Sequence, residues 1–161
     1  MCMNAGTGHT RFGDFLIEQR ENELFADEIT ELTLLYQKIF NGVYPNNPKD
    51  YEKCHETVLC WLQEKPQLFL VKYANKLIGF MMLAENMVDQ LYIDIPFRGK
   101  KLGKQLIQIA KDMYPEKLAL FTLKENKNAI AFYERQGFKI IRYGIAPDEG
   151  IPDVYMEWSA E

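Results

Sequence analysis

IDIPFRGKKLGKQLI, residues 93–107, is the stretch where an apolar run halts at a proline, passes through a loop with two glycines and enters an amphipathic helix. The first turn of an α-helix leaves backbone N–H groups without intrahelical partners and carries partial positive charge, and glycine lets an anion come close. Four cations and no acid surround this turn, in a chain of net charge −4: Arg98, Lys100, Lys101 and Lys104. The pattern predicts an anion site, although a solvated basic helix start would carry the same charges.

Two common phosphate-binding loops do not fit this stretch. A P-loop needs G-x-x-x-x-G-K-[ST], whereas Gly99 and Gly103 are too close in sequence, and Gln105 stands where the magnesium-binding hydroxyl should be. The dinucleotide fingerprint G-x-G-x-x-G is also absent. These differences argue against a nucleoside triphosphatase and against the usual nicotinamide or flavin site.

A larger segment, VDQLYIDIPFRGKKLG at residues 88–103, resembles the acyl-coenzyme A loop of the GNAT N-acetyltransferases. That family has [QR]-x-x-G-x-[GA] directly after a central strand. Arg98 takes the first position and Gly103 the last, but Lys101 stands where the family usually has glycine. A lysine at this position still offers its backbone N–H if its φ is negative.

A second block supports the same resemblance. LFTLKENKNAIAFYERQGF, residues 120–138, is similar to the family's later block N-x-x-A-x-x-[FL]-Y-x-x-x-G-F. Every specified position matches: Asn126, Ala129, Phe132, Tyr133, Gly137 and Phe138. The two blocks follow each other in the family's order and cover about the C-terminal half of the chain, which is thereby identified as a GNAT member.

Hydrophobic periodicity predicts alternating strands and helices along the chain. Strands are predicted near 12–17, at 68–73, 77–83, 88–95 and 118–122, from 139 onward and at 155–158, and helices from 27 to 41, from 51 to before 66, after 103 and at 126–136. The run 118–122 lies between two helices, so it should be parallel to the preceding strand. With the resemblance, this order implies an α/β (mixed α+β) GNAT-type fold, a central mixed twisted sheet of about six or seven strands flanked by about four helices.

Composition favours one domain over residues 1–161. The chain is 47% hydrophobic and 26% charged, a size and balance that suit a single core, and the first ten residues are expected to be flexible. No apolar run approaches the about 20 residues of a membrane span, and the opening lacks a signal peptide's apolar core, so a cytoplasmic location is predicted. Three cysteines without a C-x-x-C pair and two histidines predict no disulfide framework and no metal site.

The resemblance implies acetyl-coenzyme A as acyl donor and an amine as acceptor. It assigns the diphosphate to the loop and the start of its helix, and the pantetheine arm to the backbone of Leu91 and Ile93. The loop residues concerned are Arg98, Gly99, Lys100, Lys101, Leu102, Gly103 and Lys104. Asn126 is expected to cap the helix that follows it, to contact the cofactor, or both.

Catalysis by such an enzyme requires an amine without its extra proton, a stabilised oxyanion and a leaving thiolate. The resemblance makes Tyr133 the general acid for the thiolate and a cofactor contact, although a tyrosine on an apolar helix face also suits a core position. Glu85 and Asp89, and also Asp94, are candidates for the general base. Each could equally be a solvated or capping carboxylate, and a small fraction of free amine could suffice without a base.

The acceptor site is the least determined part of the sequence. Tyr36, Phe40 and Tyr44 are candidate substrate contacts, with Tyr51 and the acids of the loop at 148–153 as further candidates, although aromatic residues at helical spacing are usual in a core. The leading prediction is an N-acetyltransferase acting by direct attack of a primary amine, from a small molecule or a protein, on the thioester. A non-catalytic acyl-coenzyme A binding module and an acetyltransferase of aminoacyl-tRNA are the alternatives, and a pI near 5.3 argues against nucleic acid. The amine, the preferred acyl group, a monomer or homodimer, and the pathway are left open.

Overall fold

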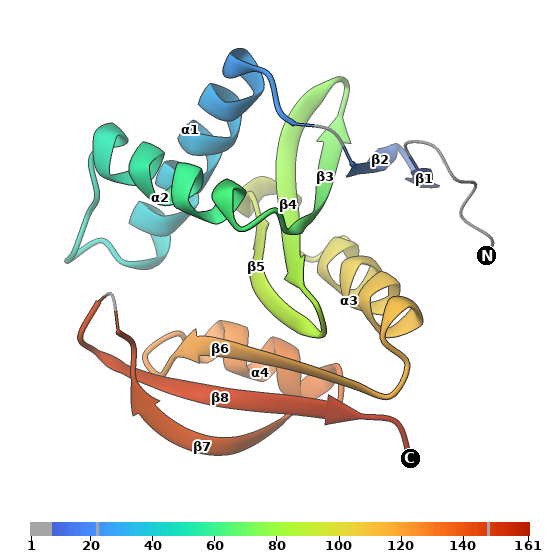
Figure 1. Ribbon diagram of the computed structural model, residues 1–161, viewed down its shortest axis with the longest axis vertical. Coiled ribbons are helices and arrows are strands. Elements are labelled where there is room, and N and C mark those ends of the chain that lie inside the picture. The colour runs from blue at the N-terminus through green and yellow to red at the C-terminus, as the bar shows by residue number, and fades with distance from the viewer. Residues whose placement is uncertain (1–7, 22, 148) are drawn as a thin grey trace. The chain divides into compact units, whose positions relative to one another are not determined.

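The structure, a computed structural model, describes residues 8–21, 23–147 and 149–161 (Figure 1). The described residues form eight strands, four α-helices and one short 3-10 helix. In chain order these are β1 (His9–Phe12), β2 (Phe15–Arg20), α1 (Ala26–Val43), α2 (Tyr51–Gln63), β3 (Gln67–Tyr73), β4 (Lys76–Ala84), β5 (Met87–Ile93), η1 (Ile95–Phe97), α3 (Leu102–Met113), β6 (Lys117–Leu123), α4 (Lys127–Arg135), β7 (Lys139–Ile145) and β8 (Pro152–Ser159).

The strands form one mixed sheet with the order β1-β2-β3-β4-β5-β6-β8-β7. Strand β5 pairs with β6 in parallel through Met87 with Ala119 and Val88 with Leu120, whereas β6 pairs with β8 in antiparallel fashion. The α/β class and the predicted parallel direction of 118–122 are therefore confirmed.

The sheet has eight strands, not the six or seven that were expected. The difference includes the N-terminal region, where a single strand was predicted near residues 12–17. The chain reverses there, because Gly13 takes a left-handed φ of 59°, and β1 pairs with β2 from Phe12 and Phe15 outward. Most of the first ten residues, which were expected to be flexible, lie outside the described residues, but His9 and Thr10 belong to β1.

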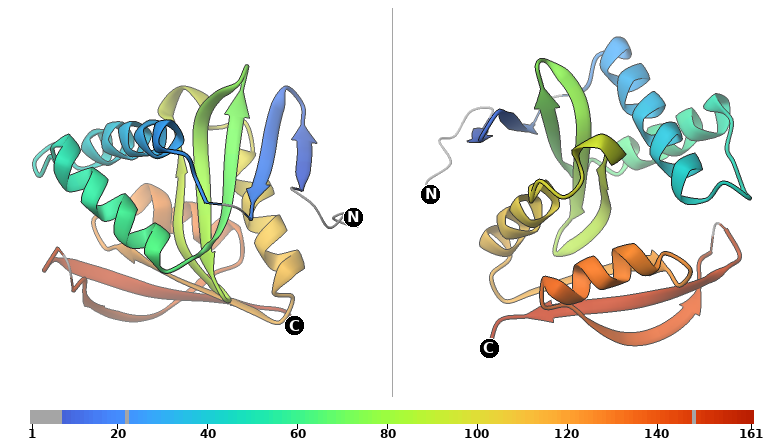
Figure 2. Two further views of the ribbon diagram at one scale, coloured as in Figure 1. Left: turned by 45° about the horizontal axis from the view of Figure 1, so that its top comes forward. Right: turned by 180° about the vertical axis from the view of Figure 1, so that it is seen from behind.

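The chain divides into two compact units. The first contains the described part of the chain up to Met82 together with Gln90–Gly103, and in it α1 and α2 lie side by side (Figures 1 and 2). The apolar faces of both helices and of β3 and β4 share one core, which includes Leu32, Ile39, Val58, Leu70 and Phe80. Burial of these side chains provides the main favourable contribution to the stability of this unit.

The second unit contains Leu83–Asp89 and Lys104–Glu161. Here α4 lies along one face of the strands β6, β8 and β7 (Figures 1 and 2). The buried apolar side chains of this second unit include Leu106, Leu118, Phe138, Val154 and Met156. The prediction of a single domain stays a prediction. None of the helices in the described part of the chain is long and apolar enough to cross a membrane.

Candidate active site

The predicted anion loop lies between β5 and α3. Strand β5 ends at Ile93, η1 holds the proline, and Arg98 follows η1 as its C-cap. The Arg98 Nε–H group donates a hydrogen bond of 3.0 Å to the Ile93 carbonyl oxygen, so this side chain ties the loop to the end of the strand. The bond uses one lone pair of that oxygen and leaves the other available.

Two residues of the loop have left-handed backbones, Gly99 with φ 76° and Lys101 with φ 66°. The condition of a negative φ for Lys101 is therefore not met. The position where the resembled family usually has glycine carries the conformation that glycine adopts without cost, and here a lysine adopts it. Left-handed residues in a turn of this kind, followed by a helix N-terminus, form backbone concavities that bind anions.

The space and charge around this loop suit a diphosphate. A Cβ built on Gly99 would meet no atom within 4 Å, so the backbone is open to an approaching group. The side chains of Lys100, Lys101 and Lys104 are exposed, and the first turn of α3 contains no acid. Leu102, by contrast, is buried and anchors the helix start in the core.

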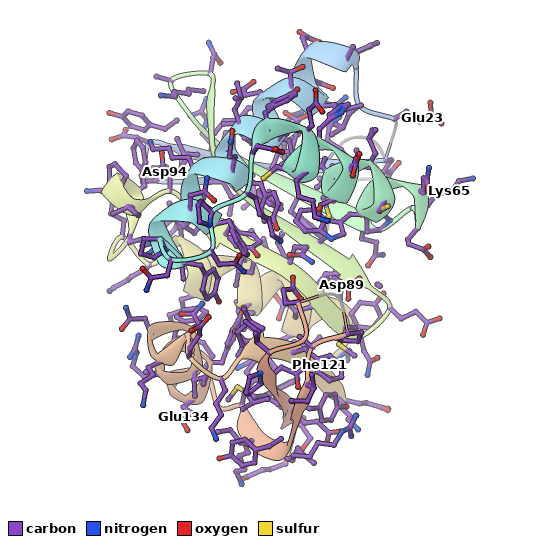
Figure 3. All side chains as sticks on the ribbon, turned by 90° about the vertical axis from the view of Figure 1, so that its left-hand side faces the viewer. Glu23, Lys65, Asp89, Asp94, Phe121 and Glu134 are labelled. Carbon is purple, nitrogen blue, oxygen red and sulfur yellow. The ribbon has the colours of Figure 1, made fainter. Side chains whose placement is uncertain are left out.

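Asp94 braces the entrance to the loop, as the labelled side chain beside the α1 ribbon shows (Figure 3). It is 3% exposed, accepts a hydrogen bond of 2.9 Å from the Ile95 N–H group and forms a 2.9 Å ion pair with Lys38 of α1. A buried carboxylate with these partners fixes the strand end relative to α1. This arrangement favours the capping alternative for Asp94 over a role as general base.

Strand β5 approaches β4 closely beside the residues that the resemblance assigns to pantetheine. A Cβ on Gly79 would lie 2.6 Å from Ile93 Cδ1 and 2.8 Å from the Tyr92 carbonyl oxygen. The two strands can therefore reach this spacing only with glycine at position 79. Leu91 and Ile93 are half-buried.

Helix α4 begins at a side-chain cap. Asn126 is its N-cap and accepts a hydrogen bond of 3.2 Å from the Ala129 N–H group. Asn126 therefore caps α4, which was one of the two roles expected for it.

The other end of α4 is a Schellman motif. The Phe138 N–H group donates to the Tyr133 carbonyl oxygen and the Gly137 N–H group to that of Glu134, both at 3.0 Å, while Gly137 has φ 93°. The rings of Tyr133 and Phe138 meet edge to face with centroids 5.6 Å apart. The tyrosine, the glycine and the phenylalanine of the motif are thus parts of one helix end.

Tyr133 projects from this fixed position and is 8% exposed. Desolvation by burial raises the pKa of its phenol far above the usual value. The hydroxyl group therefore stays protonated, and able to donate a hydrogen bond, throughout the neutral and mildly alkaline range.

Lys111 of α3 supports the same helix end, a role that the sequence did not suggest. Its ammonium group donates a 2.6 Å hydrogen bond to the Gln136 carbonyl oxygen and lies 4.7 Å from the centre of the Trp158 ring. A cation at the C-terminus of a helix complements the macrodipole. Its spacing on α3 gave no signal, because a lysine on the polar face of a helix is usually solvated.

The base candidates Glu85 and Asp89 both belong to the second unit. Glu85 lies in the turn between β4 and β5 with φ 53°, and its side chain is exposed. Asp89 lies on β5, is also exposed and is labelled in Figure 3.

The candidate substrate contacts of α1 belong to an aromatic cluster in the first unit. We define this cluster by five residues: Tyr36, Phe40, Tyr44, Trp61 and Tyr92. Tyr36 contacts Trp61 and Tyr92 with ring centroids 4.7 and 5.6 Å apart, and Phe40 lies 4.8 Å from Tyr44. Tyr51 instead stacks on His55, with centroids 5.6 Å apart.

Sequence reasoning missed Tyr92 as a member of the cluster. Tyr92 could have been found from the alternation of side chains along β5. It stands between Leu91 and Ile93, so its side chain lies on the opposite face of the strand from theirs. Of the loop acids, Asp148 lies outside the described residues, whereas Asp153 is buried on β8. Among the described residues, no group of three His, Cys, Asp or Glu side chains could hold a metal ion.

A model of the acetyltransferase (GNAT) family matches residues 29–138, more than half of the chain. The chain belongs to this family. It is therefore an N-acetyltransferase with acetyl-coenzyme A as donor, which supports an enzyme rather than a binding module.

Individual relatives agree with the family. The chain is 28% identical to the peptidyl-lysine N-acetyltransferase YjaB of Escherichia coli (strain K12) over 127 residues, 78% of this chain and 86% of the relative. The solution structure of apo-form YjaB from Escherichia coli has a TM-score of 0.73 at 23% identity and covers 91% of this chain and 99% of its own. A Thermoplasma acidophilum PaiA N-acetyltransferase, crystallised with coenzyme A, has a TM-score of 0.62 at 20% identity, covering 89% and 99%. These two structures are similar in fold.

Proposed function

We propose that this GNAT enzyme acetylates the ε-amino group of a lysine side chain in a protein or peptide. The observation that carries the proposal is the loop with left-handed residues at Gly99 and Lys101 that leads into α3, within a chain of this family. The peptidyl-lysine acceptor is supported by the name of the relative YjaB. The aromatic cluster is consistent with it, because aromatic faces attract primary ammonium groups.

The donor is held by backbone and cationic groups. The diphosphate is bound by the backbone N–H groups of residues 99–104. Arg98 orients this loop through its hydrogen bond to the Ile93 carbonyl oxygen. The backbone of Leu91 and Ile93 pairs with the pantetheine amides. Asn126 shapes the start of α4 and contacts the cofactor.

Tyr133 assists departure of the thiolate. The raised pKa of its phenol makes complete proton transfer to a thiolate, whose parent thiol has a pKa of about 8.5, unfavourable. The hydroxyl therefore stabilises the developing negative charge mainly as a hydrogen-bond donor. Such a donor contributes most when it is held rigidly, as the Schellman motif holds Tyr133.

The amine must lose a proton before it attacks the thioester carbonyl. Glu85 or Asp89 accepts this proton directly or through water, or the amine enters already neutral. Glu85→Gln and Asp89→Asn distinguish these routes, because removal of a true base changes the dependence of turnover on pH, whereas removal of a solvated carboxylate leaves it intact.

A thiol-release assay with acetyl-coenzyme A tests the proposed function. We expect release with Nα-acetyl-lysine amide and lysine-containing peptides to exceed release with polyamines, free amino acids and a lysine-free peptide that has a free N-terminus. Calorimetric titration of coenzyme A, run in parallel, separates binding from turnover. Binding without thiol release from any amine would contradict the proposal, and preferential release with polyamines or N-terminal amines would contradict the lysine acceptor.

Tyr133→Phe tests the role of the phenol. We expect kcat to fall roughly 100-fold, as for loss of a general acid or its hydrogen bond, while the Kd of acetyl-coenzyme A changes little. Tyr143→Phe is the control, because Tyr143 is an exposed tyrosine of β7. Equal losses in kcat and affinity, or an unchanged kcat, would remove Tyr133 from this role.

The cellular location and the oligomeric state of this enzyme stay predictions. Cytoplasmic location accords with a protein acceptor and is tested by cell fractionation. A homodimer is tested by sedimentation velocity at micromolar concentration.

A further inference from the structure

Lys49 lies in the connector between α1 and α2, and its backbone is fixed to α1 by two amide side chains. Asn41 accepts a hydrogen bond of 2.8 Å from the Lys49 N–H group and donates one of 3.0 Å to the Lys49 carbonyl oxygen. Gln37, one turn earlier on α1, donates to the same oxygen at 3.1 Å. The Cα of Lys49 is therefore held in place in a segment that is otherwise a turn-rich loop.

The side chain of Lys49 reaches the aromatic cluster. Its ammonium nitrogen lies 4.0 Å from the centre of the Phe40 ring and 5.8 Å from that of Tyr36. It also donates a hydrogen bond of 3.2 Å to the Tyr36 hydroxyl oxygen. A ring face and a phenolic oxygen are two kinds of neutral group that can bind a primary ammonium group.

Lys49 presents the same chemical group that the proposed acceptor presents, an ammonium group on a four-carbon chain. Its position over Phe40 excludes a second cation from that ring face by overlap and by repulsion of like charge. The four-carbon stem can rotate away while Asn41 and Gln37 keep the backbone fixed. Departure of the ammonium group therefore need not disturb the connector.

We propose that Lys49 is an internal competitor of the substrate, occupying the place in the aromatic cluster where the acceptor's ammonium group binds, and that it thereby sets the affinity for the acceptor. The identity of the acceptor rests on the proposed function, whereas the existence of an ammonium site in the cluster does not. The residue gives the enzyme a lower affinity for isolated amines than the cluster alone would provide, and favours acceptors whose other contacts offset displacement of Lys49.

The kinetic test compares Lys49→Met with Lys53→Met. Lys53 is an exposed lysine of the neighbouring helix α2 and provides the matched control. We expect Lys49→Met to lower the KM for Nα-acetyl-lysine amide about 3- to 10-fold, the range expected for one cation–π contact and one hydrogen bond from a partly solvated charged donor. The kcat and the Kd of acetyl-coenzyme A should be unchanged, Lys49→Arg should keep the high KM, and Lys53→Met should resemble the wild type.

A second measurement does not require turnover. In a Trp158→Phe background, Trp61 is the sole tryptophan, and its ring lies 4.7 Å from that of Tyr36 in the cluster. Titration with n-butylammonium should quench or enhance its fluorescence at an about 3- to 10-fold lower concentration in Lys49→Met than in the lysine-containing protein. n-Butanol, the neutral isostere of n-butylammonium, should bind equally to both.

The outcomes separate this inference from the proposed function. An unchanged or raised KM in a folded Lys49→Met protein, together with unchanged butylammonium binding, would overturn the competitor role while the acetyltransferase activity stands. Tighter butylammonium binding in a chain that acetylates no amine would uphold the ammonium site and overturn the proposed function alone. If Lys49→Met does not fold, Lys49→Gln carries the same expectations, because it removes the charge and keeps a donor for Tyr36.

Discussion

Lys101 shows what a single residue contributes to the cofactor loop. Its left-handed backbone costs a non-glycine residue about 1–2 kcal/mol, and the cost is tolerated at a position in the proposed diphosphate loop. The family pattern identified the position, because it usually specifies glycine there. The sequence could not reveal that lysine adopts the glycine conformation, since φ depends on how the loop closes between η1 and α3.

Replacing Lys101 by glycine or by alanine separates its backbone from its charge. Both variants lose the ammonium group, but only glycine relieves the left-handed conformation, at an offsetting entropy cost of about 0.5–1 kcal/mol. We expect Lys101→Gly to be more stable than Lys101→Ala by roughly 0.5–1 kcal/mol in urea denaturation. The Kd of coenzyme A should rise to a similar extent in both variants, because each loses one exposed cation. Equal stability of the two variants would mean that this backbone position is not strained.

Helix α4 shows why the second sequence block, residues 120–138, was informative. Asn126 caps one end of the helix, and Gly137 with Phe138 completes the other. Most of the positions that the motif specifies therefore determine how the helix begins and ends. The bounds predicted for this helix were therefore close to those observed. The N-terminal hairpin was missed, because β1 and β2 are short and their turn at Gly13 interrupts an otherwise continuous strand pattern.

Gly137→Ala tests the helix end that holds Tyr133. The substitution places a Cβ 3.1 Å from Trp158 Cδ1 and forces alanine into a left-handed conformation. We expect a loss of about 2–3 kcal/mol in stability and a lower kcat, because the Tyr133 carbonyl oxygen accepts one of the bonds of the Schellman motif.

Gly150→Ala is the control for this substitution. Gly150 also has a left-handed φ of 68°, but a Cβ there would meet no atom within 4 Å. It should lose only about 1–2 kcal/mol and retain its kcat. Equal losses in the two variants would show that contact with Trp158 contributes nothing beyond the backbone conformation.

The features of the structure that sequence alone could not supply are contacts between side chains and backbone of different segments. Lys38 meets Asp94, and Asn41 meets Lys49, through side chains that no periodicity or local motif connects. The order of elements was predictable because each is specified within about ten to twenty residues by its own pattern. The brace at Asp94 and the occupant of the aromatic cluster depend on which face of α1 meets which loop, and only the folded chain determines that.

Global stability should report the burial of Tyr133. Burial raises the pKa of this phenol in the folded protein, whereas in the unfolded chain it ionises near pH 10. Above that pH the unfolded state binds fewer protons than the folded state, so stability present at lower pH is lost as the pH rises. One such group steepens the decline in the free energy of unfolding by up to about 1.4 kcal/mol per pH unit.

Tyr133→Phe removes this contribution, so its free energy of unfolding should decline less steeply than that of the wild type between about pH 10.5 and 11.5. Urea denaturation at closely spaced pH values measures both slopes. Tyr143→Phe, which removes a phenol that is 63% exposed, is the control substitution. Parallel slopes for Tyr133→Phe and the wild type would mean that the phenol of Tyr133 ionises in the folded protein. The phenol is protonated at neutral pH in either case, so this equilibrium measurement tests the burial of Tyr133 independently of its role as a hydrogen-bond donor.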